Sequence, residues 1–397
     1  MAGRIEELLG GKVGIAEGAM GTMLLSGSSS MGDDLMALNV EKPERIGGIH
    51  WLYRGAGATC AISNSFSPCT SDDPVVQAER AKIVTASVRI AREANPDALV
   101  LGDMGPSSLM LEPLGAEPFD KVLGIYKRHI EALLAGGPDA ILLETFIEVA
   151  DLRCAIIAAR EVCELPIIAS CSFNESLVMP LSSTPPEVAA IIAESLGADM
   201  VGVNCGFGPD KMLEVVERMS AATSLPLIVQ PNAGLPQVLE SGETVYPGTP
   251  AEMASYASRY VELGAAIVGS CCGSTPAFTQ AICDAVGGVA LQPRGDVDST
   301  LVACSMSASE AVDPDGFDPD DCECLDVADA LFDPEDALEL VGDLPVAVID
   351  GSGNDFAEHL DDLVRTLRLY PGRAVVQVGN KEGLAASMAK DHGAIIL

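Results

Sequence analysis

The sequence predicts a closed (βα)8 TIM barrel followed by a small, incomplete α/β unit. Short apolar segments alternate with amphipathic segments of helical period from the N-terminus to about residue 286. The apolar segments are apolar almost throughout, which is typical of parallel strands covered on both faces. Polar or glycine-rich residues follow nearly every one of them. Because the carboxyl ends of all barrel strands meet at one mouth, we expect the functional residues to gather there.

Eight segments are expected to form the strands of this barrel, and seven longer segments to form helices between them. The strands are predicted at 13–16, 59–63, 98–101, 140–143, 166–171, 200–203, 226–229 and 265–268. The helices are predicted at 75–94, 119–135, 149–162, 186–196, 210–221, 250–263 and 275–285. Proline or glycine stands at most of the boundaries, as expected where one element ends and the next begins.

The composition changes after residue 288, and we expect three regions. The barrel takes residues 1–288, an acidic linker rich in Asp, Gly, Ser and Pro takes 289–322, and a partial α/β fragment takes 323–397. In the fragment, strands are predicted at 323–327, 345–349, 374–378 and 394–397, and helices at 334–341 and 356–369. These elements are too few for a second complete barrel.

The formal net charge of −35 argues against nucleic acid and anionic membranes as partners, because such a surface repels phosphate groups. No apolar run approaches the roughly 20 residues that a membrane-spanning helix needs. The first residues lack the apolar stretch of a signal peptide, so we expect a cytoplasmic protein. Twelve irregularly spaced cysteines in such a chain favour free thiols and metal ligands over disulfides.

Three cysteines stand where predicted strands end: Cys205 after the sixth strand, and Cys271 and Cys272 after the eighth. Neighbouring side chains on a strand point to opposite faces, so the adjacent pair can bind one ion only if the backbone bends there. Gly269 and Gly273 flank the pair and permit such a bend. Three thiolates with a fourth position open are typical of a catalytic zinc that receives a substrate thiol. The alternative is that the pair consists of small buried residues or forms a vicinal disulfide.

Other residues at the strand ends could hold the rest of an amino-acid substrate. Glu144 would supply a carboxylate for an ammonium group, and Asn232 an amide that binds polar atoms or orients another ligand. The remaining strand ends contribute the candidates Glu17, Gly18, Asn64 and Phe66. Each of these residues could equally serve only the fold.

Eight short strings resemble the homocysteine S-methyltransferase family over about residues 10–286. They are E-G-A-M-G-T (17–22), S-N-S-F (63–66), G-D-M-G-P (102–106), E-T-F (144–146), V-N-C-G (203–206), Q-P-N-A-G (230–234), V-Y-P (245–247) and G-S-C-C-G (269–273). The resemblance implies zinc ligands at Cys205, Cys271 and Cys272, and homocysteine contacts from Glu144 and the acid at position 17. The family usually has Asp at position 17 and T-N-T-F at 63–66, and the longer Glu17 could shift the preferred thiol.

The tail resembles in part the pterin-binding barrel of cobalamin-dependent methionine synthase, over about residues 299–397. The likeness rests on L-D-V-A-D (325–329), A-V-I-D (347–350) and L-R-L-Y-P-G-R (367–373). The G-E-R-x-N signature of that barrel is not recognisable near residues 304–310, Gln377 stands where Asn is usual, and there is no cobalamin-binding D-x-H-x-x-G motif. We expect a degenerate partial barrel that does not bind folate.

The leading hypothesis is zinc-dependent methyl transfer to the thiol of homocysteine, which gives methionine. A separate methyl-corrinoid protein is the expected donor, although S-methylmethionine, S-adenosylmethionine or a betaine could take its place. Two alternatives stay open: a corrinoid-linked methyltransferase or demethylase subunit that acts on another thiol, and a non-catalytic scaffold.

Overall fold

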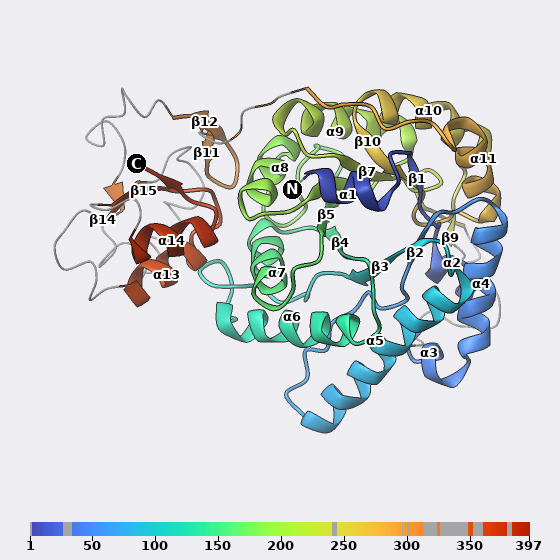
Figure 1. Ribbon diagram of the computed structural model, residues 1–397, viewed down its shortest axis with the longest axis horizontal. Coiled ribbons are helices and arrows are strands. Elements are labelled where there is room, and N and C mark those ends of the chain that lie inside the picture. Colours follow the sequence, from blue (N-terminus) through green and yellow to red (C-terminus); the bar gives the residue numbers. More distant parts are fainter. Residues whose placement is uncertain are drawn as a thin grey trace.

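The barrel is closed by eight parallel strands in the order β1-β10-β7-β6-β5-β4-β3-β2 (Figure 1). This computed structural model describes residues 2–26, 34–239, 244–295, 297, 299, 302–312, 324–325, 348–351, 360–378 and 383–397. A parallel bridge between Ala16 and Cys60 joins the first and last strands of the sheet. Backbone hydrogen bonds from Thr59 N to Ile15 O (2.8 Å) and from Glu17 N to Cys60 O (3.1 Å) complete this seam. The predicted (βα)8 barrel is confirmed.

All eight predicted barrel strands are found close to their predicted positions. They are β1 (Gly14–Ile15), β2 (Cys60–Ile62), β3 (Leu99–Met104), β4 (Ala140–Phe146), β5 (Ile167–Cys171), β6 (Met200–Asn204), β7 (Leu227–Gln230) and β10 (Ala265–Val268). A short antiparallel pair, β8 (Gln237–Val238) with β9 (Thr244–Val245), follows β7. Several strands run further toward the mouth than predicted, because polar residues continue them there.

The seven predicted helices surround the barrel, and four further helices precede β2. The seven are α5 (Pro74–Ala94), α6 (Phe119–Leu134), α7 (Val149–Val162), α8 (Pro186–Ser195), α9 (Pro209–Ala222), α10 (Pro250–Glu262) and α11 (Pro276–Val286). The others are α1 (Ala2–Leu8), α2 (Met20–Leu25), α3 (Leu38–Glu41) and α4 (Pro43–Gly55). The sequence pattern does not predict α4, whose interior contains Gly47 and Gly48, both poor helix formers.

The interior of the barrel is apolar below and polar at the mouth. Leu101 of β3 and Leu142 of β4 belong to a cluster inside the barrel. Since side chains alternate along a strand, the next inward positions in these strands belong to Asp103 and Glu144. Both side chains line a cavity at the mouth. The strand pattern thus brings both acids to that cavity, with Asp103 in register with Leu142 and Glu144 two residues further along β4.

A second unit follows the barrel and packs beside α7 and α8 (Figure 1). It begins with an antiparallel hairpin of β11 (Val302–Cys304) and β12 (Ser309–Ala311), within the range predicted as a linker. A parallel sheet follows in the order β13 (Cys324–Leu325), β14 (Val348–Gly351), β15 (Val375–Val378) and β16 (Ile395–Ile396), with helices α13 (Leu360–Leu369) and α14 (Leu384–Asp391). The predicted helix at 334–341 lies outside the described residues.

Arg153 of α7 joins the two units and is only 1% exposed. Its guanidinium donates hydrogen bonds to the carbonyl oxygens of Tyr370 and of Leu367, the latter at 2.9 Å. Arg368 of α13 forms an ion pair with Asp120 of α6 at 2.6 Å. These contacts explain why α7 is buried on almost all sides: the barrel covers one face and the second unit the other.

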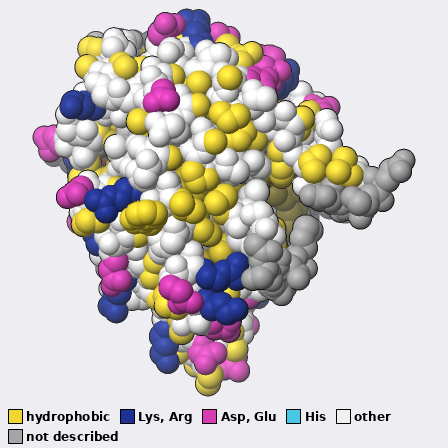
Figure 2. Space-filling view, turned by 90° about the vertical axis from the view of Figure 1, so that its right-hand side faces the viewer, with side chains coloured by type: hydrophobic (Ala, Val, Ile, Leu, Met, Phe, Trp, Pro, Cys, Tyr) yellow, Lys and Arg dark blue, Asp and Glu magenta, His cyan; other side chains and the backbone are white. Residues whose placement is uncertain are grey.

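The face formed near α4 and α11 is mixed in character. Figure 2 shows scattered apolar side chains on this side of the molecule, between both acidic and basic ones. Trp51 of α4 is the most exposed aromatic side chain described, at 65%. The net negative charge therefore does not make this face uniformly acidic. No described helix is both long and apolar enough to cross a lipid bilayer.

Candidate metal centre and ligand cavity

The sulfur atoms of Cys205, Cys271 and Cys272 all lie within 4.8 Å of one another. Cys205 directly follows β6, and the adjacent pair follows β10, so the three meet at the mouth of the barrel. A tetrahedral ion with metal–sulfur distances of about 2.3 Å holds its sulfurs about 3.8 Å apart. The structure thus brings together the three cysteines singled out from the sequence, at a spacing that suits one soft metal ion.

The backbone leaves extended geometry at both cysteine segments. Cys205 has a φ of 61°, which is uncommon for a residue other than glycine. After the pair, Gly273 has a φ of 77°, and a Cβ atom there would lie 2.1 Å from Cγ of Tyr246. Between these bends, Cys271 N donates to Pro231 O at 2.7 Å and ties the pair to the end of β7. This is the bend that the adjacent cysteines require to face one point.

Hydrogen bonds within the sulfur group shift the pKa values of its three thiols in different directions. Hydrogen bonds from the thiols of Cys271 and Cys272 lower the pKa of Cys205, aided by the Gly206 N–H and the Asn232 side chain. The same contacts raise the pKa of Cys271 and, through Cys205, that of Cys272 to about 12. A half-buried, electron-rich sulfur cluster of this kind is suited to a cation.

A cavity of about 610 Å³ opens beside the sulfurs. Its lining contains the three cysteines and most of the substrate contacts predicted from the sequence, namely Glu17, Gly18, Asn64, Phe66 and Glu144. Asn232 is not part of this lining; it is buried, and its amide contacts the sulfur of Cys205 instead. The predicted residues therefore divide into one that supports the sulfurs and five that face the cavity.

Glu17 contacts a buried histidine, His50, that no sequence motif predicts. Its Oε2 lies 2.8 Å from Nδ1 of His50, on α4, and accepts a hydrogen bond from Ile62 N at 3.1 Å. Both side chains are almost fully buried. The extra methylene of Glu17 thus lets its carboxylate reach α4 and β2. No motif surrounds His50 in the sequence, so only the fold could reveal this pair.

Asp103, in the string G-D-M-G-P, also lines the cavity, although it is not among the substrate contacts predicted from the sequence. It is 3% exposed, and its Oδ1 has no hydrogen-bond partner among the described residues. Burial and the neighbouring charge of Glu144 raise the pKa of Asp103 well above its usual range. Burial and then the charge of Cys205 raise the pKa of Glu144 to about 7. Its spacing of two residues from Leu101 was the signal in the sequence that could have identified Asp103.

Asn204 holds the bend that aims Glu144 into the cavity. Thr145 has a φ of 61°, a strained conformation for a β-branched residue, and β4 shifts its register at this point. The Asn204 Oδ1 accepts hydrogen bonds from Thr145 N (2.9 Å) and from Ser170 Oγ (2.7 Å). Its Nδ2 donates to Thr145 Oγ1 at 2.6 Å. The fully buried amide therefore stabilises an otherwise unfavourable backbone next to Glu144.

His129 of α6 lies behind Asp103 and makes the stability of the fold depend on pH. Its Nε2 is 3.4 Å from the carbonyl oxygen of Asp103, and its Nδ1 has no partner among the described residues. Burial lowers the pKa of His129 from 6.5 to about 4, against hydrogen bonds to the Asp103 and Ser65 backbones and together with the charge of Arg80. The folded protein thus keeps this imidazole neutral at pH values where the unfolded chain protonates it.

We expect His129 to destabilise the fold as the pH falls from 6.5 to about 4. In that interval the unfolded chain binds one more proton than the folded one, so the free energy of unfolding rises with pH. The complete shift corresponds to about 3 kcal/mol. Urea unfolding of wild type and His129→Gln at several pH values checks this, since both share all carboxylates. Parallel pH profiles of the two proteins would contradict the expectation.

Comparison with known proteins gives three kinds of match. The family model described as homocysteine S-methyltransferase matches residues 14–286. The methionine synthases of Mycobacterium tuberculosis (strain ATCC 25618 / H37Rv) and Mycobacterium leprae (strain TN) are each 32% identical, over 307 and 305 residues, or 71% and 70% of this chain. These alignments cover 25% of each relative, so the chain spans about a quarter of their length.

Solved structures of the homocysteine methyltransferase MmuM from Escherichia coli share the fold of the barrel. The oxidized form has a TM-score of 0.59 and 25% identity, covering 71% of this chain and 99% of that chain. The metallated form has a TM-score of 0.59 and 23% identity, covering 70% and 98%. The similarity therefore extends over nearly the whole of those chains.

Proposed function

Because this chain belongs to the homocysteine S-methyltransferase family, we propose that it methylates the thiol of homocysteine and so forms methionine. The observation that carries this proposal is the group of three sulfurs beside a cavity large enough for a small ligand. A carboxylate, Glu144, faces the same cavity and suits the ammonium group of an amino acid. Sulfur chemistry and amino-acid recognition are thus supported in one place.

We propose zinc as the metal, with Cys205, Cys271 and Cys272 as its ligands. The spacing of the sulfurs and their soft character support this assignment. When bound, zinc lowers the pKa of a substrate thiol, which can then react as a thiolate. Asn232 and the Gly206 N–H, which donate to the Cys205 sulfur, orient that ligand and reduce its charge.

The other cavity residues position the two reactants. Glu144 accepts hydrogen bonds from the ammonium group of homocysteine. Gly18 lines the same cavity and leaves room for the side chain of Ser274, since a Cβ at position 18 would lie 2.6 Å from Ser274 Oγ. In the transfer, a bond forms between the homocysteine sulfur and the methyl carbon as the bond from that carbon to the donor breaks. The donor keeps that electron pair, and the thiol proton passes to solvent.

We propose a separate methyl-corrinoid protein as the donor and the cytoplasm as the location. The curated relatives named methionine synthase and the tail that resembles part of that enzyme support the donor. The free state of the ten cysteines described supports a reducing compartment. We also propose that the chain divides into a barrel (1–288), a linker (289–322) and a partial α/β unit (323–397).

A donor panel tests the function. Zinc-loaded protein is incubated with homocysteine and, in turn, a methyl-corrinoid protein, S-methylmethionine, S-adenosylmethionine and a betaine, and methionine is measured by mass spectrometry. We expect methionine with the corrinoid protein. Methionine from another donor only would reject the corrinoid proposal, and none from any donor would reject the function. If other thiols are methylated faster than homocysteine, the substrate is wrong.

A further inference from the structure

Arg80 of α5 provides positive charge in an otherwise acidic cavity. Among the described residues that line the cavity it is the only lysine or arginine, whereas Glu17, Asp34, Asp103 and Glu144 are acidic. Its side chain is 25% exposed. A small ligand that carries a carboxylate therefore meets one cationic side chain in this part of the structure.

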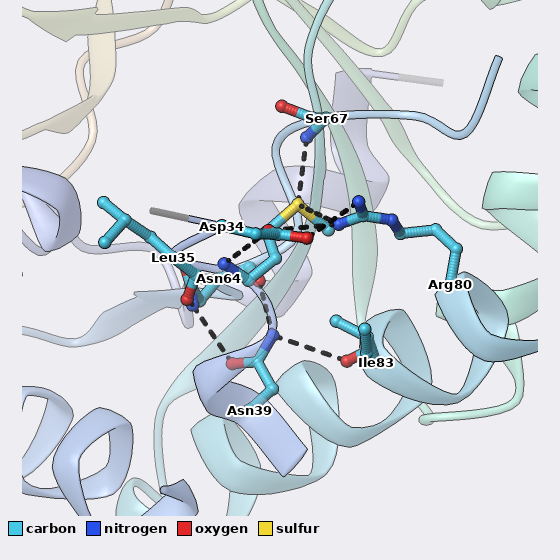
Figure 3. Close-up of polar contacts among 8 residues, drawn as sticks. Asp34, Leu35, Asn39, Asn64, Ser67, Arg80 and Ile83 are labelled. Atoms are coloured by element: carbon cyan, nitrogen blue, oxygen red, sulfur yellow. Dashed lines mark hydrogen bonds and ion pairs between the residues drawn. The ribbon is translucent and has the colours of Figure 1, made fainter. Parts of the chain in front are cut away.

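The guanidinium of Arg80 forms an ion pair with the carboxylate of Asp34, as Figure 3 shows. The two side chains form a two-pronged pair, with Nη2 to Oδ2 at 2.9 Å and Nη1 to Oδ1 at 3.3 Å. This is the geometry with which arginine binds any carboxylate. Sδ of Met36 lies 3.5 Å from Nη1 and accepts from Ser67 N at 3.3 Å, so the guanidinium also contacts a second residue of the cavity lining.

The Asp34–Arg80 pair can be replaced by a ligand at little cost. The Asp34 side chain is 47% exposed, and ion pairs exposed to water contribute little to stability. A ligand carboxylate that enters the cavity would meet the same guanidinium in a less hydrated setting. The carboxylate of Asp34 thus holds the position at Arg80 that a ligand carboxylate would take.

The three sulfurs, Asp103, Glu144 and Arg80 all line this cavity. Ser65 Oγ donates to the carbonyl oxygen of Asp103 at 2.8 Å, and two residues further along the chain Ser67 N and the Arg80 guanidinium both donate to Sδ of Met36. Homocysteine presents its thiol at one end and its ammonium and carboxylate groups at the other.

We propose that Arg80 binds the carboxylate of the amino-acid thiol in exchange for Asp34, while Asp103 joins Glu144 around its ammonium group. This inference rests on the proposed function. Asp103 offers a buried oxygen without a partner, and an ammonium group has three donors to distribute. Each pole of the amino acid then meets a group of opposite charge.

Truncated ligands test each pole separately. Binding to the zinc-loaded protein is measured by calorimetry for homocysteine, for 3-aminopropane-1-thiol, which lacks the carboxylate, and for 4-sulfanylbutanoic acid, which lacks the ammonium group. Arg80→Met should weaken the two carboxylate ligands about 10- to 100-fold and leave the aminothiol unchanged. Asp103→Asn should weaken homocysteine and the aminothiol but not the thiol acid. Asp34→Asn should tighten the carboxylate ligands about 3-fold or more, because it removes the competitor.

Arg89→Met on the same helix is the matched control, since Arg89 donates to Ala135 O outside the cavity. It should leave all three affinities unchanged. An equal loss for the aminothiol in Arg80→Met, or a change in the donor KM alone, would overturn the proposal. If Arg80→Met does not fold, the wild type decides: it must bind homocysteine at least about 10-fold more tightly than the aminothiol. These binding measurements need no methyl donor, so their result is distinguishable from a failure of the proposed methyl transfer in the donor panel.

Discussion

Replacing Cys205 by serine is expected to remove both bound zinc and methyl transfer. A serine hydroxyl is a hard donor that stays protonated at neutral pH, so two sulfurs remain for an ion that needs three protein ligands. The residue cannot be replaced by a neighbour, because its left-handed conformation aims this one side chain at Cys271 and Cys272. Zinc should fall from about one ion to less than about 0.1 per chain, and methionine formation at least about 1,000-fold. Metal analysis by mass spectrometry and the methionine assay check both values.

Cys283→Ser is the control for this substitution. Cys283 lies in α11, is half-buried, and has a pKa raised by burial, so it is an inert thiol outside the sulfur group. Its replacement should leave zinc and activity unchanged. Full zinc content in Cys205→Ser would refute the proposed ligand set. A wild-type protein that binds no zinc would favour the scaffold alternative.

Asn204→Leu is expected to cause the largest loss of stability of the single substitutions considered. The change keeps the number and branching of the side-chain heavy atoms but leaves Thr145 N, Thr145 Oγ1 and Ser170 Oγ without their partner, and it removes the contact of Nδ2 with Cys271 Sγ at 3.9 Å. Each loss costs about 1 to 3 kcal/mol, so a total of about 3 to 5 kcal/mol is expected. Urea unfolding measures it. Because the bend at Thr145 aims Glu144, the KM for homocysteine should also rise at least about 10-fold.

Ser170→Ala separates the two effects of this change. It removes one hydrogen bond to Asn204 and leaves both contacts with Thr145 in place. We expect a loss of about 1 kcal/mol and an unchanged KM for homocysteine. If Asn204→Leu were no more destabilising than Ser170→Ala, the amide would not support the strained bend.

The barrel was predictable because each of its strands can be recognised from its own residues. A strand covered on both faces must be apolar along its length, so each of the eight was visible without knowledge of its neighbours. The sulfur group was predictable for a related reason: Cys205 and the pair at 271–272 follow two such strands, and barrel strands end at one mouth. The chemistry of three thiolates already indicated zinc, and the resemblance to a known family implied the same three ligands.

Other features could not be read from single segments. The helix α7 is buried on almost all sides because a second unit covers its outer face, and no residue near Arg153 in the sequence indicates that Tyr370 is its partner. For Asn232 the sequence left open whether the amide binds substrate or orients another ligand, and in the structure its side chain turns to Cys205. Each outcome depends on which surface packs nearby.

The sequence alone determined the barrel, the order of its elements and the three sulfur positions, because these depend on periodicity and on the strand ends. Only the tertiary structure decided which polar side chains meet in and around the cavity. Glu17 meets His50, Asp103 meets Glu144, and Arg80 meets Asp34 across separations of 33, 41 and 46 positions. Electrostatic pairing acts over a few ångströms in space, and the distance along the chain does not reveal it.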